Sequence, residues 1–236
     1  MIYGSLFSGI GGIDLGLDRA GMTCAWQVES NRYCREVLAR HWPLVDRYDC
    51  VTRVGKDDLM PVNLICGGFP CQDISYAGKG AGLHGKKSGL WSEYIRIVRE
   101  IRPRYVLVEN VPALLARGID RVLGDLAEIG YDAEWDCLPA AAFGAPHRRD
   151  RLFIVAYTGR QRSPEHHTAT SGRKQGVFDR VAIPSGPSWP SESGVVRVGD
   201  GVPNDVDRIR ALGNAVVPQV AEALGQAIMS HARDWP

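Results

Sequence analysis

Two side chains that could do covalent chemistry stand just after apolar runs that are typical of buried strands. Cys71 follows the run 62–66 through the loop Gly-Gly-Phe-Pro, and Glu109 directly follows the run 105–108. In an open α/β sheet, ligands bind beyond the carboxyl ends of the parallel strands, where both residues are expected. A thiolate is a nucleophile, and a glutamate flanked by valines is expected to have a raised pKa, which suits an acid near neutral pH. An incidental loop cysteine and a salt-bridged surface glutamate stay open as alternatives.

Two arginines, Arg149 and Arg151, are candidates for the recognition of an anion or a carbonyl group. They stand at the start of an apolar run of β composition, and in an extended chain residues two apart point to the same side. Two guanidinium groups on one face suit a phosphate or a base carbonyl. Surface charge at the entrance of a strand explains the same pattern, and the arginines alone do not decide between the two.

The segment 7–12, Phe-Ser-Gly-Ile-Gly-Gly, has the composition of a tight turn between a strand and a helix. Glycines there allow a ligand to approach the backbone closely, and the helix N-terminus favours polar or anionic groups. Glu29 ends the next strand pattern, where its carboxylate can accept hydrogen bonds from both ribose hydroxyls of an adenosine cofactor. The pattern does not distinguish NAD, FAD and S-adenosylmethionine, and a plain glycine-rich turn stays an alternative.

Apolar runs that alternate with amphipathic helical patterns must position these residues. Such alternation is typical of a parallel sheet covered by helices, an α/β fold. Residues 158–204 are rich in Gly, Pro, Ser and Arg, show no sustained periodicity and allow isolated short strands around 176–183 and 195–198. Strands are predicted over 2–7, 23–28, 62–66, 105–108, 134–138 and 151–156, and helices over 11–20, 31–41, 91–101, 115–129 and 214–229.

The overall composition fits one soluble domain with a small appendage. The chain has 236 residues, of which 44% are hydrophobic and 23% charged. No apolar run reaches the ~20 residues needed to cross a bilayer, and no secretory signal pattern is present, so a cytoplasmic protein is expected. The cysteines lack zinc spacing, so we expect free thiols and no metal site. Net charge is +1, but residues 147–180 are locally basic, which fits either a phosphate-contacting face or a solvated loop.

The order of the motifs along the chain decides what no single motif can. The glycine turn is followed by Gly-Gly-Phe-Pro-Cys-Gln, then Glu-Asn-Val, then Arg-x-Arg, and finally Gly-Asn-Ala-Val-Val-Pro at 213–218. This succession resembles the C5-cytosine DNA methyltransferase family over most of residues 1–157 and 207–230. Gly-Gly-Phe-Pro-Cys-Gln followed by Glu-Asn-Val is highly specific. The chance that these motifs occur together in this order is negligible.

The resemblance implies a fold, a domain organisation and a partner. The fold is α/β, a Rossmann-like S-adenosylmethionine-dependent methyltransferase with a mostly parallel sheet and a reduced target-recognition insertion. Residues 1–157 and 207–236 would form the catalytic and cofactor-binding domain, and residues 158–206 a small target-recognition region. Double-stranded DNA would be the substrate, and a monomer is expected. A partner chain that supplies recognition stays open.

The resemblance also assigns roles to individual residues. Cys71 would attack carbon 6 of a flipped-out cytosine, which makes carbon 5 reactive towards the methyl group of S-adenosylmethionine. Glu109 would be the acid that hydrogen-bonds N3, and Arg149 and Arg151 would lie beside the target base. Asp49 would reach the adenine amino group. The cofactor site would comprise Phe7, Gly9, Gly11, Gly12, Glu29, Asp49, Gly68, Pro70, Leu90, Asn214, Ala215 and Val216.

Departures from the family pattern leave more than one hypothesis open. Ser30 stands where the family usually has a larger residue that packs on adenine, and the region 158–206 is much shorter than the usual recognition domain. The first hypothesis is an active DNA methyltransferase from a phage, prophage or restriction-modification locus. A tRNA cytosine methyltransferase and a non-catalytic nucleic-acid-binding protein are the alternatives. An NAD-dependent dehydrogenase is set aside because it would leave Cys71 and Glu109 without a role.

Overall fold

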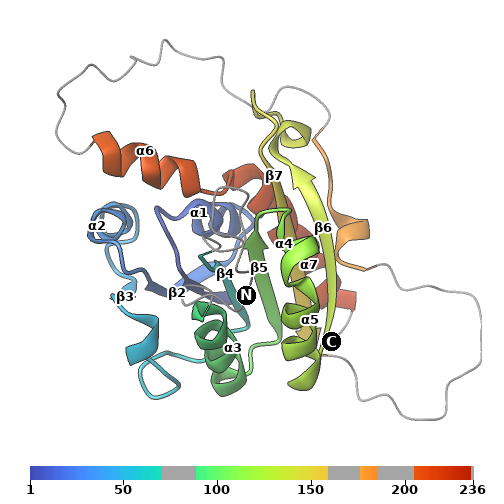
Figure 1. The fold of residues 1–236 in the computed structure, drawn as a ribbon, viewed down its shortest axis with the longest axis horizontal. Helices are drawn as coiled ribbons and strands as arrows, with labels where there is room; N and C mark the ends of the chain where they lie inside the picture. The colour runs from blue at the N-terminus through green and yellow to red at the C-terminus, as the bar shows by residue number, and fades with distance from the viewer. Residues whose placement is uncertain (71–88, 159–175, 185–204, 235–236) are drawn as a thin grey trace, which may run out of the picture.

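The computed structural model describes residues 1–70, 89–158, 176–184 and 205–234. These residues form a seven-stranded sheet with the order β3-β2-β1-β4-β5-β7-β6 (Figure 1). Strands β1 to β5 are parallel to one another, whereas β7 is antiparallel to both β5 and β6. The strands are β1 (Ile2–Leu6), β2 (Thr23–Val28), β3 (Asp46–Tyr48), β4 (Leu64–Gly68), β5 (Tyr105–Asn110), β6 (Tyr131–Pro139) and β7 (Asp150–Thr158).

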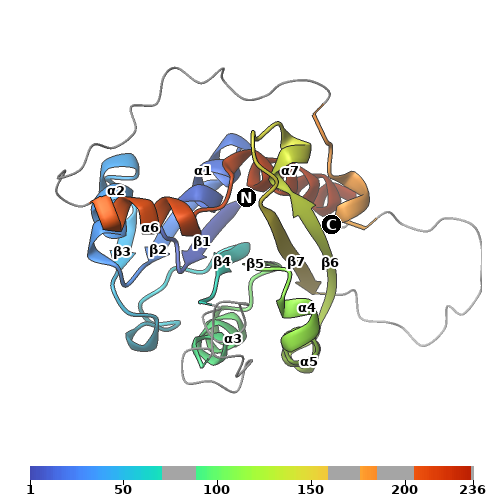
Figure 2. The ribbon, with the colours of Figure 1, turned by 45° about the horizontal axis from the view of Figure 1, so that its top comes forward.

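Helices cover both faces of the sheet (Figure 2). Helices α1 and α7 lie on one face and α3, α4 and α5 on the other. Alternate residues of each central strand enter the two cores, as Val106 and Leu107 of β5 do. The helices are α1 (Gly12–Arg19), α2 (Arg32–His41), α3 (Leu90–Ile101), α4 (Leu114–Arg117), α5 (Ile119–Glu128), α6 (Asp205–Asn214) and α7 (Pro218–Asp234), with 3-10 turns η1 (Val51–Arg53), η3 (Ala140–Phe143) and η4 (Phe178–Arg180).

The order of the strands reverses between β1 and β4. The chain leaves β1 to form β2 and β3 on one side, and then returns to β4 on the other side of β1. Helices that connect strands on opposite sides of such a point leave a crevice beyond the carboxyl ends of the strands. The fold therefore places the ends of β1 and β4 at the preferred ligand position of open α/β sheets.

Most of the predicted elements are confirmed, and the differences have local causes. The helix predicted over 115–129 is divided at Gly118, whose φ of 150° is open to glycine alone. The helix predicted from residue 214 begins at Pro218, because proline suits the first turn of a helix, where no intrahelical N–H bond is lost. Strand β5 extends beyond the predicted end to Asn110, so Glu109 lies inside the strand.

One prediction for the irregular region is wrong, and one helix beyond it was not predicted. The short strand allowed around 176–183 is wrong, since these residues contain the 3-10 turn η4. Helix α6 was not predicted, because its apolar residues are few and recur only three residues apart. The possible strand at 195–198 lies outside the described residues. Among the described helices, none is both long and apolar enough to span a membrane.

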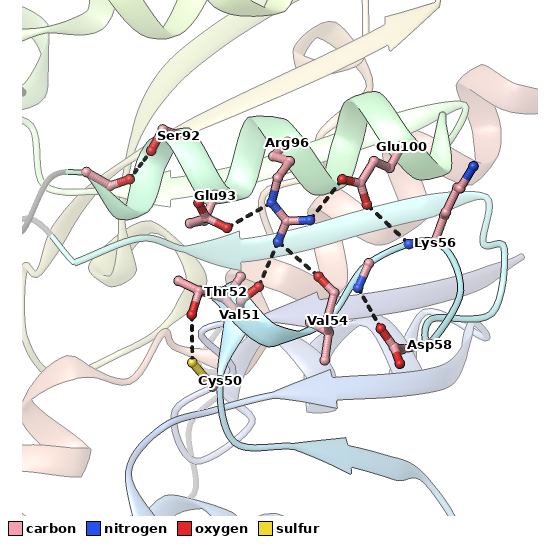
Figure 3. Close-up of polar contacts among 12 residues, drawn as sticks. Cys50, Val51, Thr52, Val54, Lys56, Asp58, Ser92, Glu93, Arg96 and Glu100 are labelled. Atoms are coloured by element: carbon pink, nitrogen blue, oxygen red, sulfur yellow. Dashed lines mark hydrogen bonds and ion pairs between the residues drawn. The ribbon is translucent and has the colours of Figure 1, made fainter.

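Arg96 ties α3 to the loop that follows β3 (Figure 3). Its guanidinium donates hydrogen bonds to the carbonyl oxygens of Val51 and Val54, both at 2.9 Å. The same group forms ion pairs with Glu93 at 2.8 Å and with Glu100 at 2.9 Å. Because hydrogen bonds to a charged donor are among the stronger ones, this group fixes the connection between β3 and β4.

We expect Arg96→Met to lower the free energy of unfolding by about 2 kcal/mol, since two backbone carbonyl groups lose a charged donor. Urea unfolding of both proteins measures the difference. Arg99→Met is the matched control, because Arg99 is 55% exposed and lies 3.9 Å from Glu128. Its effect should stay below about 0.5 kcal/mol. Equal losses in the two variants would contradict this account.

Candidate active site

A cavity of about 380 Å³ lies beyond the carboxyl ends of β1 and β4. Its walls come from the ends of β1, β2, β4 and β5, the start of α1 and the junction between α6 and α7. The structure thus brings together segments from both ends of the chain. Of the residues expected at a catalytic or cofactor site, those that line the cavity are Phe7, Gly9, Gly12, Glu29, Gly68, Pro70, Glu109, Arg151, Asn214, Ala215 and Val216.

Three expected cofactor residues do not line this cavity. Gly11 forms the N-cap of α1 with a φ of 84°, and a Cβ at this position would lie 2.5 Å from the ring of Trp42. Asp49 is exposed and lies in a separate surface groove. Leu90 begins α3 and packs against the hydrophobic core. These placements follow from loop and helix packing that sequence motifs do not encode.

The backbone that leads to Cys71 runs along the cavity wall. Strand β4 ends at Gly68, and Phe69 and Pro70 both line the cavity; Cys71 itself lies outside the described residues. Gly68 pairs with Glu109 of the neighbouring strand, and a Cβ on Gly68 would lie 2.4 Å from Oε2 of that carboxyl group. The absence of a side chain at Gly68 therefore makes room for the Glu109 carboxyl group.

Glu29 organises the glycine turn at the end of β1. Its Oε2 accepts a hydrogen bond from the Gly9 amide at 2.8 Å, and its Oε1 accepts one from the Asn31 amide at 2.7 Å. Gly9 has a φ of 56°, and a Cβ there would meet nothing within 4 Å, so this part of the turn faces open space. Each carboxylate oxygen has a second lone pair. The group can therefore accept further hydrogen bonds from a ligand in the cavity.

Glu109 and Arg151 form a partly buried ion pair in the cavity wall. Arg151 Nε lies 2.9 Å from Glu109 Oε1, and the two side chains are only 20% and 12% exposed. Burial raises the pKa of Glu109 from 4.5 to about 7, although the charges of Arg151 and Arg149 act in the opposite direction. The raised pKa agrees with the sequence prediction. This carboxyl group can hold a proton near neutral pH and donate it to a ligand.

Arg149 and Arg151 have different partners, contrary to the expectation that both would face one ligand. Arg149 has a φ of 36°, so the chain is not extended there, and the alternation of side chains in a strand does not apply. Its guanidinium donates to the carbonyl oxygens of Gly213 at 2.8 Å and Ala215 at 2.5 Å. Arg149 therefore contacts the α6–α7 junction, while Arg151 contacts Glu109.

Helix α6 adds cavity residues that the sequence motifs missed. Asp207 and Ala211 line the cavity from this helix. The sequence signal for this helix is weak, because Val206, Ile209 and Leu212 recur only at a spacing of three. In the structure, Leu212 is 55% exposed. The position of α6 depends on tertiary contacts of the junction that follows it.

The α6–α7 junction touches the start of α1 closely. A Cβ on Gly12 would lie 2.3 Å from the carbonyl oxygen of Val216, so the two backbones meet with no side chain between them.

Within the described part of the chain, no group of three His, Cys, Asp or Glu side chains is arranged to hold a metal ion.

The comparisons with known proteins agree with this architecture. The protein M2.BsuMI of Bacillus subtilis, a type II methyltransferase, is 35% identical over 160 residues, which are 64% of this chain and 41% of that protein. M.NgoFVII of Neisseria gonorrhoeae, also a type II methyltransferase, is 29% identical over 241 residues, 96% of this chain and 64% of that protein. The chain thus spans about half the length of these curated relatives.

The strand order and the cavity at its switch point define an α/β, Rossmann-like methyltransferase fold. The crystal structure of a protein described as a DNA modification methyltransferase, encoded within an Escherichia coli prophage, has the same fold with a TM-score of 0.58 and 26% identity. The match covers 67% of this chain and 47% of that chain. The family described as C-5 cytosine-specific DNA methylase matches residues 1–182, and the chain belongs to this family.

We expect Gly12→Ala to destabilise the fold by about 1–3 kcal/mol, because the new methyl group would overlap the Val216 carbonyl group, which belongs to the backbone. Thermal unfolding measures the effect. Gly124→Ala in α5 is the matched control, since a Cβ there would meet nothing within 4 Å. Alanine in a helix interior should stabilise by roughly 0.5–1 kcal/mol. Unfolding midpoints that shift in the same direction would contradict the close contact.

We expect the free energy of unfolding of Glu109→Gln, relative to that of the natural protein, to be higher at pH 8 than at pH 5. The folded pKa of about 7 lies above the ordinary value of 4.5, so the stability linked to this proton is complete below pH 4.5 and is lost as the pH rises through about 7. In the natural protein this loss amounts to about 3 kcal/mol. Glu109→Gln does not undergo it, because a glutamine side chain does not titrate. Urea unfolding at both pH values measures it.

Glu128→Gln is the control for this experiment, because the Glu128 side chain is 72% exposed. Its stability should follow the natural protein at both pH values. If Glu109→Gln also follows the natural protein, the raised pKa is wrong.

Proposed function

We propose that the chain transfers a methyl group from S-adenosylmethionine to carbon 5 of cytosine in double-stranded DNA. The single observation that carries the proposal is the Glu109–Arg151 pair, with the pKa of Glu109 at about 7, in the same cavity as the glycine turn and Glu29. Membership of the C-5 cytosine-specific DNA methylase family supports the reaction. The names of the two relatives support methyl transfer, and the description of the prophage protein supports a role in DNA modification. We expect the protein to act in the cytoplasm.

The cavity fits S-adenosylmethionine. Its volume of about 380 Å³ is in the range of small-molecule sites, and Gly9 leaves one wall open to a ligand. The free lone pairs of Glu29 suit the two ribose hydroxyls, and Phe7 and Val216 provide apolar walls. When bound, S-adenosylmethionine supplies an electrophilic methyl group. Gly11, Asp49 and Leu90 are left out of the proposed site because they do not line the cavity.

Glu109 and Arg151 would act on the cytosine ring. Protonated Glu109 would donate a hydrogen bond to N3, and this bond strengthens as negative charge develops on the ring. Arg151, 2.9 Å from the carboxyl group, holds Glu109 in place and keeps positive charge next to the ring. The partial burial of both groups strengthens these interactions, because water screens them less.

Cys71 would be the nucleophile. A bond from its sulfur to carbon 6 makes carbon 5 an enamine carbon. This carbon can accept the methyl group as the bond between the methyl group and the sulfonium sulfur breaks, with S-adenosylhomocysteine as the leaving group. Loss of the carbon-5 proton to solvent and cleavage of the bond between sulfur and carbon 6 then restore the aromatic ring and the thiolate. The placement of Pro70 on the cavity wall and the pairing of Gly68 with Glu109 support this role.

A stacked base is inaccessible to these groups, so the target cytosine would have to be flipped out of the duplex. Residues 1–157 and 207–236 would form the catalytic unit, and residues 158–206 the recognition region. Within that region, residues 176–184 include Val177, which is fully buried in the core that α7 also enters. A monomer is the simplest form of this proposal.

The proposal is tested by transfer of a radiolabelled methyl group to unmethylated duplex DNA and, in parallel, to tRNA. We expect transfer to DNA at carbon 5 of cytosine, mapped by bisulfite sequencing. Cys71→Ala should abolish it, and Glu109→Gln should slow it by about 10²–10⁴-fold. Cys50→Ala is the control, since Cys50 is a free cysteine outside the cavity, and it should retain activity.

Three outcomes would overturn the proposal. Labelling of tRNA alone would assign the chain to a different substrate. Binding of DNA without any methyl transfer would indicate a non-catalytic role. Undiminished transfer by Cys71→Ala would exclude the covalent route.

A further inference from the structure

The Arg149 side chain holds the polypeptide between α6 and α7. Its guanidinium donates to the carbonyl oxygens of Gly213 and Ala215, which stand on either side of Asn214. Gly213 belongs to the last turn of α6, where carbonyl groups lack intrahelical donors and the helix dipole favours positive charge. Arg149 therefore supplies the C-terminal cap of α6 from a segment far away in sequence.

The junction that Arg149 holds is a wall of the proposed cofactor cavity. Asn214, Ala215 and Val216 all line it. On the opposite side, the Val216 carbonyl group lies so close to Gly12 that a Cβ on Gly12 would overlap it. The junction is thus held between the glycine turn and Arg149. A loss of the Arg149 bonds would remove the restraint on the side opposite Gly12.

The backbone and side chain of Arg149 carry strain that such a role explains. A φ of 36° is unfavourable for a residue with a Cβ. The backbone is held in this conformation by η3, since the Ala140 amide donates to the Arg149 carbonyl oxygen at 3.4 Å. The Nε atom is buried and has no hydrogen-bond partner among the described residues. The strained backbone and the unpaired Nε atom occur at a position from which the guanidinium reaches the carbonyl groups of both Gly213 and Ala215.

We infer that Arg149 is a positioning residue for the methyl-donor site, which it completes by fixing the α6–α7 junction, and that it is not a contact to the target base. The inference rests on the proposed function, because it concerns the cavity proposed to bind S-adenosylmethionine. Arg151, two residues later, faces Glu109 and serves the base side of the same cavity. Arg149 thus fixes the wall of the proposed cofactor site, and Arg151 holds Glu109.

The experiment is titration of the whole chain with S-adenosylhomocysteine in the absence of DNA, by calorimetry. Arg149→Met should weaken binding by about tenfold or more, because two charge-assisted hydrogen bonds to the junction are lost. Arg149→Lys should weaken it less, since an ammonium keeps the charge but lacks the fork that reaches both carbonyl groups. Arg148→Met is the matched control, because Arg148 is 85% exposed and pairs only with Asp150 among the described residues; its affinity should not change.

Steady-state kinetics separate positioning from a general loss of structure. The KM for S-adenosylmethionine should rise in Arg149→Lys, while the KM for DNA stays unchanged. Unchanged affinity for S-adenosylhomocysteine together with a raised KM for DNA would overturn the inference and return Arg149 to the target base. An equal loss of affinity in Arg148→Met would also overturn it. Should Arg149→Met not fold, Arg149→Lys decides by the same measurements.

Failure of the inference and failure of the proposed function are distinguishable. If the natural chain does not bind S-adenosylhomocysteine, the proposed function fails. If the natural chain binds it and Arg149→Lys and Arg149→Met bind it equally well, only the inference fails.

Discussion

Burial of the Glu109 carboxyl group beside the Arg151 guanidinium depends on the direction of one strand. Because β7 is antiparallel to β5, its first residues lie at the carboxyl end of β5, where Asn110 pairs with Leu152 and Glu109 with Phe153. Arg151, at the start of β7, therefore arrives at the edge where the parallel strands end. A parallel strand at this position would bring its last residues there instead. The antiparallel strand β7 thus brings an acid and a cation together in the cavity. The partial burial of these charges costs free energy, which the two hydrophobic cores must offset.

The cavity also depends on close approach between helices from the two ends of the chain. A Cβ on Gly16 of α1 would lie 2.4 Å from the carbonyl oxygen of Pro218, and one on Gly225 of α7 would lie 2.8 Å from the Cβ of Ala20. Small residues at this interface let α7 pack directly against α1. That packing brings the residues before α7 to the glycine turn. The glycines therefore serve two purposes, since some shape the turn itself and others allow a distant segment to close the cavity.

The sequence could predict most strands and helices because hydrophobic periodicity is a local property. It could also predict that Glu29 and Glu109 reach one sheet edge, since the ends of parallel strands share that edge. It could not predict the partner of Arg149, because a positive φ at this residue breaks the alternation on which the prediction rested. Helix α6 and the placement of Asp49 were missed for a related reason. The end of α6 is held by Arg149, which is far away in the chain, and no local pattern records that contact.

The segment 176–184 is attached to the rest of the fold through contacts with β6 and α7. Glu134 of β6 accepts hydrogen bonds from the amides of Val177 and Phe178, at 3.2 and 3.4 Å, and from the hydroxyl of Tyr157 at 2.6 Å. Arg180 forms an ion pair with Asp234 of α7 at 2.6 Å. These contacts attach the middle of the proposed recognition region to the edge of the sheet.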